Sequence, residues 1–179
     1  MAGYTEIVAG NFKIYSAAAG TNFPGAWPVG DAAPTGYTPV GTQLISAEGI
    51  TKGLAYTTNL EHVLAWAGPV AENLESIVYT ISFECLDMTQ AFQSFALGNP
   101  ISSGGVSMEP NVGPLPEAAF IIIGPGPAEG KRLAWWLPRA TIKIDGDTVF
   151  MAGGAAKTPV TLTPLHDPTD GMGTYHLEP

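Results

Sequence analysis

The sequence predicts a mainly β fold, a β-sandwich or partly closed barrel with one flanking helix and long Pro/Gly-rich loops. Charged residues make up only 13% of the 179 residues, about half of the usual quarter, which is too few to cover many exposed helices. The 22 glycines and 16 prolines favour short strands joined by turns. Several segments also alternate apolar and polar residues, as strands do. We expect a single domain over residues 1–179, because this length can bury one core.

Two short strands are predicted near the start of the chain, over residues 4–9 and 11–17. The next segment, residues 20–49, is so rich in proline and glycine that it cannot form a regular ladder of its own. A structureless loop of this length is usually functional or disordered. Because it contains Trp27 and Tyr37, we expect it to order against another surface; the alternative is a floppy surface loop.

The clearest strand is predicted over residues 75–85, and the only helix over residues 88–97. One face of the strand is apolar at every second position, namely Ile77, Tyr79, Ile81, Phe83 and Cys85. Asp87 is a suitable N-cap for the helix, and Gly98 stands where a helix of this length would end.

The rest of the chain is predicted to contain short strands joined by turns. These strands are expected over residues 118–123, 132–137, 139–144, 149–152 and 159–165. Residues 101–116 form a second Pro/Gly-rich loop, and residues 124–130 and Asp145-Gly146 are expected to form hairpin turns. A polar tail follows over residues 167–173.

The charge pattern argues against a nucleic-acid-binding protein. The net charge is −9, and all of it arises in residues 1–130, whereas residues 131–179 are neutral. Tight binding to a phosphate backbone needs a cluster of basic residues, which this chain lacks. The single Cys85 excludes an internal disulfide and a cysteine zinc cluster. No apolar run is long enough to cross a bilayer, and the start lacks the features of a secretion signal, so we expect a soluble protein in a reducing cytoplasm.

The sequence offers no catalytic constellation. The three histidines, His62, His166 and His176, do not have metal-ligand spacing, and residues 145–147 lack the further oxygen ligands that calcium needs. Pro125 removes an amide from the glycine-rich turn that a phosphate would use. We therefore expect no enzymatic activity, no metal and no cofactor.

The adjacent tryptophans Trp135 and Trp136 point to opposite faces if their strand is regular. One indole should then leave the core of this chain and either anchor a protein interface or stack on a sugar. The low surface charge favours the interface. The interface candidates are Trp27, Tyr37, Trp135 and Trp136; the alternative is a glycan-binding module.

The order of these features resembles the major tail tube protein of long-tailed, non-contractile bacteriophages. The resemblance covers most of the chain. It rests on Asn-Phe-Lys-Ile-Tyr-Ser-Ala at 11–17 before a Pro/Gly loop, and on Tyr-Thr-Pro-Val-Gly at 37–41 leading into Ser-Ala-Glu-Gly-Ile-Thr at 46–51. The strand-to-helix unit at 77–97 and the ending Thr-Pro-Val-Thr-Leu-Thr-Pro-Leu at 158–165 are also similar.

This resemblance implies a β-sandwich or barrel with one flanking helix, assembled as hexameric rings that stack into a hollow tube. Such a tube forms in the host cytoplasm, belongs to the virion tail, and contacts the tape measure, tail tip and terminator proteins. It passes DNA without binding it specifically and has no membrane partner. The resemblance also suggests that residues 20–49 order on a neighbouring subunit.

A negatively charged lumen would repel DNA phosphates and let the duplex slide, with screening over about 8 Å preventing a large barrier. The candidates for this wall are Glu72, Glu75, Glu84 and Asp87. The alternative for these residues is that they are solubilising charges on an outer surface. Three other functions remain open: a tube subunit of a gene transfer agent or contractile injection device, a glycan-binding β-sandwich module, and an enzyme with an unrecognised site.

Overall fold

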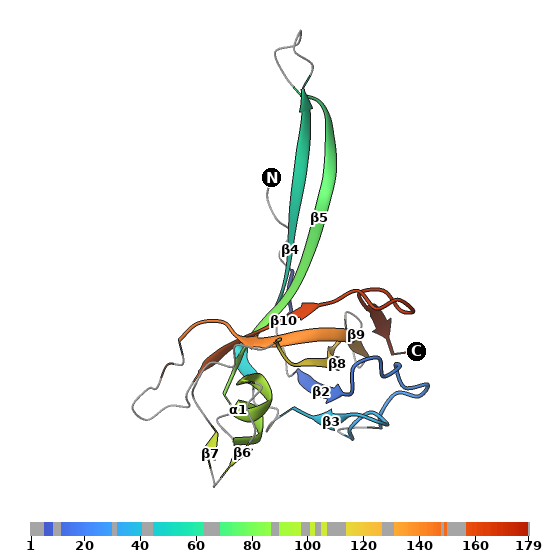
Figure 1. Cartoon of the computed structure of the whole chain (residues 1–179). Helices are drawn as coiled ribbons and strands as arrows, with labels where there is room; N and C mark the ends of the chain where they lie inside the picture. Colours follow the sequence, from blue (N-terminus) through green and yellow to red (C-terminus); the bar gives the residue numbers. More distant parts are fainter. Residues whose placement is uncertain are drawn as a thin grey trace.

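The computed structural model describes residues 6–8, 12–29, 32–40, 45–62, 69–86, 90–97, 101–102, 105–106, 114–126, 131–147, 149 and 157–178. These residues form one large antiparallel sheet, a small two-stranded sheet and one short helix (Figure 1). The strands are β1 (Glu6–Val8), β2 (Lys13–Ala17), β3 (Thr38–Pro39), β4 (Ile45–His62), β5 (Pro69–Cys85), β6 (Ile101–Ser102), β7 (Gly105–Val106), β8 (Glu117–Pro125), β9 (Arg132–Ile144), β10 (Thr158–Pro164) and β11 (Thr174–Leu177), and the helix is α1 (Gln90–Leu97). The predicted mainly β fold is confirmed.

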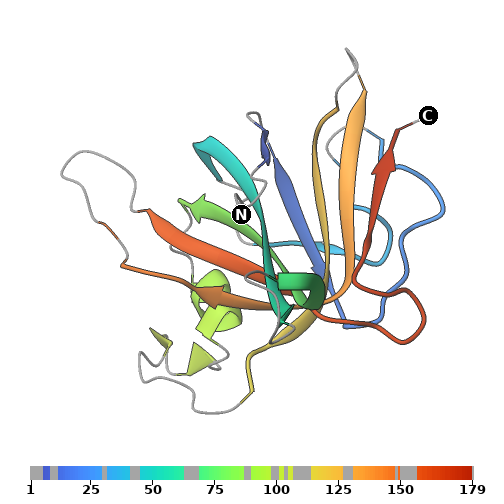
Figure 2. The ribbon, with the colours of Figure 1, turned by 90° about the horizontal axis from the view of Figure 1, so that it is seen from above.

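The large sheet has the order β1-β4-β5-β10-β9-β8-β2-β3. The long strand β9 pairs with β8 along one edge, and its other edge is shared by β10 and β11, which pair with its second and first halves. The sheet curves strongly when seen along the hairpin (Figure 2). It stays open, because its end strands β1 and β3 are not paired with each other in the described part of the chain.

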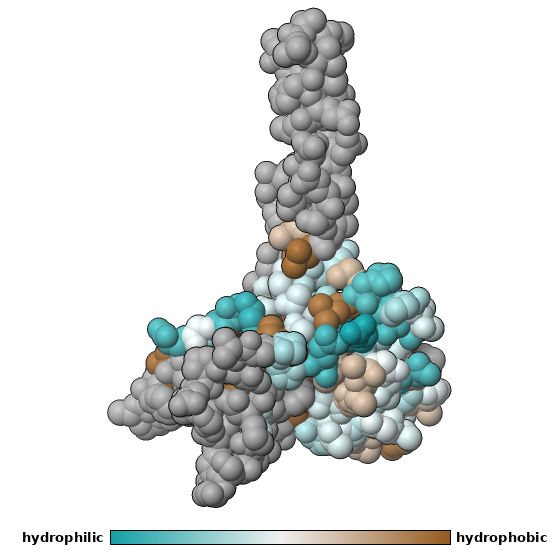
Figure 3. Space-filling model, in the orientation of Figure 1, coloured by the Kyte–Doolittle hydropathy of each residue, from teal (hydrophilic) through white to brown (hydrophobic). Residues whose placement is uncertain are grey.

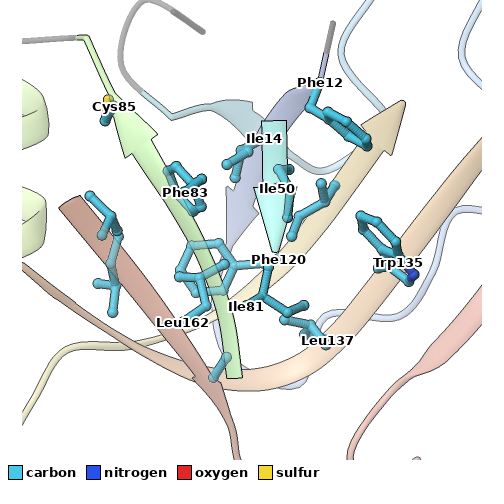
Figure 4. Packing of buried hydrophobic residues seen from close by; sticks show 14 of the residues in the cluster. Phe12, Ile14, Ile50, Ile81, Phe83, Cys85, Phe120, Trp135, Leu137 and Leu162 are labelled. Atoms are coloured by element: carbon cyan, nitrogen blue, oxygen red, sulfur yellow. The ribbon is translucent and has the colours of Figure 1, made fainter. Parts of the chain in front are cut away.

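The main core lies on the concave face of this curved sheet (Figure 4). Ile81, Phe83 and Cys85 of β5 point into it at alternate positions, as the sequence predicts. Phe12 stacks on Trp135 across the core, with ring centroids 5.8 Å apart. The helix α1 adds Phe92 and Ala96 from the end of β5, and each large side chain buried here contributes about 1.5–3 kcal/mol of hydrophobic stabilisation.

A second cluster covers the opposite face of β2, β8 and β9. Tyr15, Ile121 and Trp136 are buried there, together with Tyr37 from the loop that follows β2. The central strands β8 and β9 are therefore buried on both faces, so they are apolar at nearly every position rather than at every second one.

The strand β9 runs without a break through Pro138, where the sequence predicts two strands. Pro138 lies at a bulge, since Ala118 pairs with Ala140 and Phe120 with Leu137. On the other edge of β9, Pro138 falls between the residues paired with β10 and those paired with β11. Neither neighbour needs the amide hydrogen that proline lacks, which is the usual position of proline in a sheet.

Two further predictions are corrected by the structure. Asp145-Gly146 does not close a tight hairpin, because the strand that pairs with β9 begins only at Thr158. The end of the chain is not only a polar tail, since residues 174–177 form β11. The predicted strand at residues 75–85 is part of a longer one that starts at Pro69. Asp87, the predicted N-cap of the helix, lies outside the described residues.

The most prominent feature is the hairpin of β4 and β5, which projects far beyond the rest of the molecule (Figure 1). Only its foot belongs to the curved sheet, where β1 pairs with residues 50–52 and β10 with residues 81–85. Among the described residues, 53–62 and 69–80 pair only with each other. The pattern of the sequence does not predict this arm.

Candidate assembly surfaces

The projecting hairpin is the first candidate surface. From Lys52 at the foot to His62 at the last described pair, β4 has ten residue steps, which span about 33 Å in an extended strand. An isolated two-stranded hairpin is at best marginally stable in water, and both of its outer edges present backbone groups to which no further strand is paired in the described structure. Such edges pair readily with another chain, so the arm is suited to a contact between molecules.

The predicted lumen acids are not brought together. Glu72 lies opposite Leu60 on the projecting part of β5, and Glu75 lies at the register shift between Leu74 and Ser76. Glu84 lies at the other end of β5, twelve residues from Glu72, which is about 40 Å along a strand. Asp87 lies outside the described residues. Glu72 and Glu84 therefore lie at opposite ends of β5, and the expectation that some of these four acids line a lumen stays a prediction.

Glu84 lies on a polar face on the outside of β4, β5 and β10. Its carboxylate accepts a hydrogen bond from the Lys157 ammonium at 2.8 Å. Beside this ion pair, the Ser82 and Thr161 hydroxyls lie 3.1 Å apart, and Thr161 donates to the Asp145 carboxylate at 3.2 Å. Glu84 is thus a paired charge on a hydroxyl-rich face rather than a bare carboxylate.

The register explains why this face is hydroxyl-rich. Thr51 of β4 lies opposite Ser82, Ser82 opposite Thr161, and Thr161 opposite Lys143. These four residues form a row across four adjacent strands. Lys143 completes the row with an ion pair to Asp145 at 3.2 Å. The face therefore carries short polar side chains and charges of both signs.

The tryptophans of β9 are both inside the molecule. Trp135 is 7% exposed and Trp136 is 6% exposed. They do point to opposite faces, as predicted, but both faces are covered. The expectation that one indole leaves the core of this chain is therefore wrong, because the loop after β2 and the strand β11 cover the outer face of β9.

The cover over Trp136 is the Pro/Gly-rich loop after β2. The Trp136 indole donates to the Tyr37 hydroxyl at 3.1 Å and to the Thr21 carbonyl at 3.2 Å, and the Tyr37 hydroxyl itself donates to Thr21 at 2.8 Å. Burial raises the pKa of Tyr37, against a smaller lowering by the indole N–H. Phe23 packs edge-on against both Trp136 and Trp27.

The described part of this loop is thus ordered on the sheet of its own chain. This corrects the expectation that residues 20–49 order on a neighbouring subunit, because the apolar outer face of β8 and β9 supplies the surface within the same molecule. Tyr37 is buried there and Trp27 is half-buried. The last residues of the segment, from Ile45, belong to β4.

Residues at the end of the chain also hold the loop after β2 in place. Arg132 makes a two-pronged ion pair with Glu178, with donor–acceptor distances of 2.9 and 2.7 Å, and also donates to the Pro28 carbonyl at 2.7 Å. This hydrogen-bonded ion pair holds the pKa of Glu178 below its usual value. His176 stacks on Phe23 with ring centroids 3.9 Å apart, and burial lowers the pKa of His176.

A cavity lies at the foot of the hairpin, between the hairpin, β9 and the turn before β11. Its volume is about 380 Å³. Aromatic rings form much of its wall, namely Tyr79, Trp135 and Tyr175. The Lys52 ammonium lies 5.8 Å from the centre of the Tyr79 ring, and Tyr175 is 51% exposed. Figure 3 shows hydrophobic residues on the surface at this foot.

This cavity is not evident from the sequence, because its walls come from five separate segments of the chain. One signal was available: Thr-Tyr-His-Leu at 174–177 is rich in residues that favour strands. A strand there, paired with β9, places Tyr175 opposite Trp135. The same pairing would have shown that β9 is covered.

The described residues contain no group of three or more His, Cys, Asp or Glu side chains that could hold a metal ion. His166 is exposed, and Cys85 is buried in the main core. Within the described part of the chain, no helix is long and apolar enough to cross a bilayer.

No protein-family model matches the chain, and none of the curated proteins compared with it matches. What the chain does must therefore be inferred from its own residues.

Proposed function

We propose that this chain is a structural subunit that assembles with copies of itself, as the subunit of a phage tail tube whose hexameric rings stack into a conduit for DNA. The observation that carries the proposal is the β4–β5 hairpin, which extends about 33 Å beyond the body. The resemblance of the sequence to the tail tube family supports the tube in particular.

The arm is not needed to bury the core of its own chain. The body already buries two apolar clusters without it. The arm pairs only with itself in the described structure, so it adds unpaired edges and little stabilisation. Contact with another subunit would cover those edges, and an arm on every copy would link copies in series.

In this proposal the hydroxyl-rich outer face of β4, β5, β10 and β9 lines the conduit. The described side chains of this face are short hydroxyls and ion-paired charges, so the face does not present a cluster of unpaired cations to DNA phosphates. DNA could therefore pass along it without being held. Glu84 would lie on this wall, but its pairing with Lys157 makes its repulsion of phosphate weaker than that of a bare carboxylate. A tube subunit of a gene transfer agent or contractile device fits the same geometry.

The glycan-binding alternative loses its main support, because the indoles expected to stack on a sugar, Trp135 and Trp136, are both buried. The described residues also bring together no nucleophile, base and orienting group that would favour an enzyme. An assembling subunit is therefore the function that we propose.

A shortened hairpin tests this proposal. Residues 58–75 are replaced by Asn-Gly, so that Thr57 and Ser76, which are paired in the sheet, are joined by a two-residue turn suited to a hairpin. The foot of the hairpin and the whole body remain. We expect wild-type protein to form rings or tubes in negative-stain electron microscopy, alone or on a tail-initiation complex, and the shortened chain to stay monomeric.

The circular dichroism and unfolding of the shortened chain serve as the control for its fold. A shortened chain that assembles like the wild type contradicts the role of the arm. A wild-type chain that stays monomeric at high concentration, at low and high salt and on a tail-initiation complex contradicts the proposed function itself.

A further inference from the structure

The two strands of the arm are joined by residues 63–68, which read Val-Leu-Ala-Trp-Ala-Gly. The last described pair of the hairpin is His62 with Pro69, so this apolar segment links the strands at the end remote from the body. An arm that ended in water would be expected to carry polar turn residues there. Trp66 and Leu64 are instead residues that anchor protein interfaces or fill cores.

The segment cannot reach the cavity of its own chain. The cavity is lined by Lys52 and Tyr79 at the foot of the hairpin, about 33 Å from His62. Six residues must leave one strand and return to the other, so they can extend back by only about 11 Å. Any docking of residues 63–68 into this cavity therefore joins two copies of the chain.

The cavity suits a tryptophan side chain. Trp135 and Tyr175 contact each other in its wall, with ring centroids 6.4 Å apart, and a further aromatic ring packed on them would add about 0.5–1.5 kcal/mol to the burial of its surface. Among the described residues that line it, Lys52 is the only charged one, and a lysine ammonium is attracted most strongly to the face of an indole. The volume of about 380 Å³ lies at the small end of ligand sites, which fits one or two side chains.

We propose that residues 63–68 of one copy dock into the cavity at the foot of the hairpin of the next copy, with the Trp66 indole against the half-exposed ring of Tyr175. The arm of the first copy then lies along the body of the second. Each copy offers one arm and one cavity, so the contact is head-to-tail and can repeat from copy to copy. This inference rests on the proposed function, because it assigns the occupant of the assembly arm.

A mixing experiment with two full-length variants tests the proposal. Trp66→Asp disables the end of the arm, and Tyr175→Asp disables the cavity; Tyr175 is half exposed, so its replacement spares the core. We expect each variant alone to associate at least about 30-fold more weakly than the wild type in sedimentation velocity, as for an interface hot spot. An equimolar mixture still offers one intact arm and one intact cavity, and should form a dimer that grows no further.

Two controls separate docking from general effects on the fold. Leu177→Asp changes the same strand at a residue that is 52% exposed, against 51% for Tyr175, but Leu177 does not line the cavity. This variant should associate like the wild type. Trp66→Phe keeps an aromatic ring at the end of the arm and should restore most of the association that Trp66→Asp loses.

The outcomes distinguish this inference from the proposed function. Tubes that form equally well with Trp66→Asp overturn the docking and leave the tube standing. Association that depends on both Trp66 and Tyr175 but stops at a dimer in the wild type supports the docking and overturns the tube. A mixture of the two variants that remains monomeric, or a wild-type chain that shows no association at any concentration, overturns the docking.

Discussion

Replacing Tyr37 with phenylalanine tests whether the Pro/Gly-rich loop is held by its own chain. The Tyr37 hydroxyl lies in the outer cluster, where it donates to the Thr21 carbonyl at 2.8 Å and accepts from the Trp136 indole at 3.1 Å. The side chain is 4% exposed, so water does not readily replace a lost partner. The Tyr37→Phe variant removes the hydroxyl and leaves the ring.

The expected loss follows from counting these bonds. A hydrogen bond within a protein contributes about 0.5–1.5 kcal/mol net, and a buried group left without a partner costs about 1–3 kcal/mol. Three bonds disappear in Tyr37→Phe, because the hydroxyl hydrogen also reaches the Asn22 carbonyl at 3.3 Å, a long contact that shares this hydrogen with Thr21. The Trp136 N–H keeps the Thr21 carbonyl at 3.2 Å, and Asn22 is exposed to water, so none of these groups is left unpaired. We therefore expect the free energy of unfolding to fall by about 1–2 kcal/mol.

The assay is urea unfolding of the shortened-hairpin chain, so that association does not add to the measured stability. Thr38→Val is the matched control. Thr38 is the next residue, and its hydroxyl donates to the Ser16 carbonyl at 3.2 Å in an exposed position, so its loss should cost less than about 0.5 kcal/mol. Chymotrypsin, which cleaves after aromatic residues, should cut the loop at Phe23 or Trp27 sooner in Tyr37→Phe than in the control.

Equal unfolding free energies for Tyr37→Phe and the parent chain would refute this reasoning. So would a loop that the protease cuts at the same rate in both. Either result would mean that the contacts among Tyr37, Thr21 and Trp136 do not hold the loop, and the neighbouring subunit would again be the surface on which it orders.

Three other predictions concern different parts of the molecule. Burial lowers the pKa of His176 in the folded chain, so the unfolded chain binds a proton at this imidazole more readily. The free energy of unfolding should therefore fall as the pH drops below 6.5, the ordinary pKa of histidine, towards the lowered pKa of the folded state. His176→Gln should flatten this part of the pH profile of urea unfolding. A methyl group on Gly124 would collide with the Phe12 ring, so Gly124→Ala should destabilise the chain by about 1–3 kcal/mol in the same assay, and an unchanged stability would contradict the packing of Phe12. Glu84→Lys would place a second ammonium group beside Lys157, and tubes built from this variant should eject DNA more slowly at low salt than at high salt. The swapped variant E84K/K157E keeps an ion pair and should eject DNA normally. Equal ejection rates for the wild type and both variants would remove Glu84 from the conduit.

Alternating burial was predictable where one face of a strand meets the core and the other meets water. Ile81, Phe83 and Cys85 are buried and Glu84 lies outside, because β5 has this simple environment near the body. The same criterion could not describe β9, whose residues 133–138 are all buried. Its pattern depends on the loop and on β11, which cover the outer face from distant parts of the sequence.

The arm was not predictable because, unlike β9, it has no face buried in the core. Beyond Gly53, the hairpin leaves the core, so no alternation between core and solvent marks β4 as a strand. The cavity at the foot of the hairpin was not predictable either. Trp135 was recognised as important, but its surroundings depend on Tyr79 and Tyr175, which come next to it only through the sheet pairing and through β11.

Burial of β8 and β9 on both faces also affects how these strands find their correct alignment. In an ordinary strand, a slip by one residue would turn apolar side chains to water and is strongly disfavoured. Here a slip would exchange Trp135 for Trp136, and both positions would remain apolar. Alignment must instead depend on features that fit in one place only. Gly124 alone leaves room for the Phe12 ring, and Pro138 fits only at the bulge. Substitutions at these two residues are therefore expected to yield misaligned, aggregation-prone chains more often than substitutions of the large apolar residues around them.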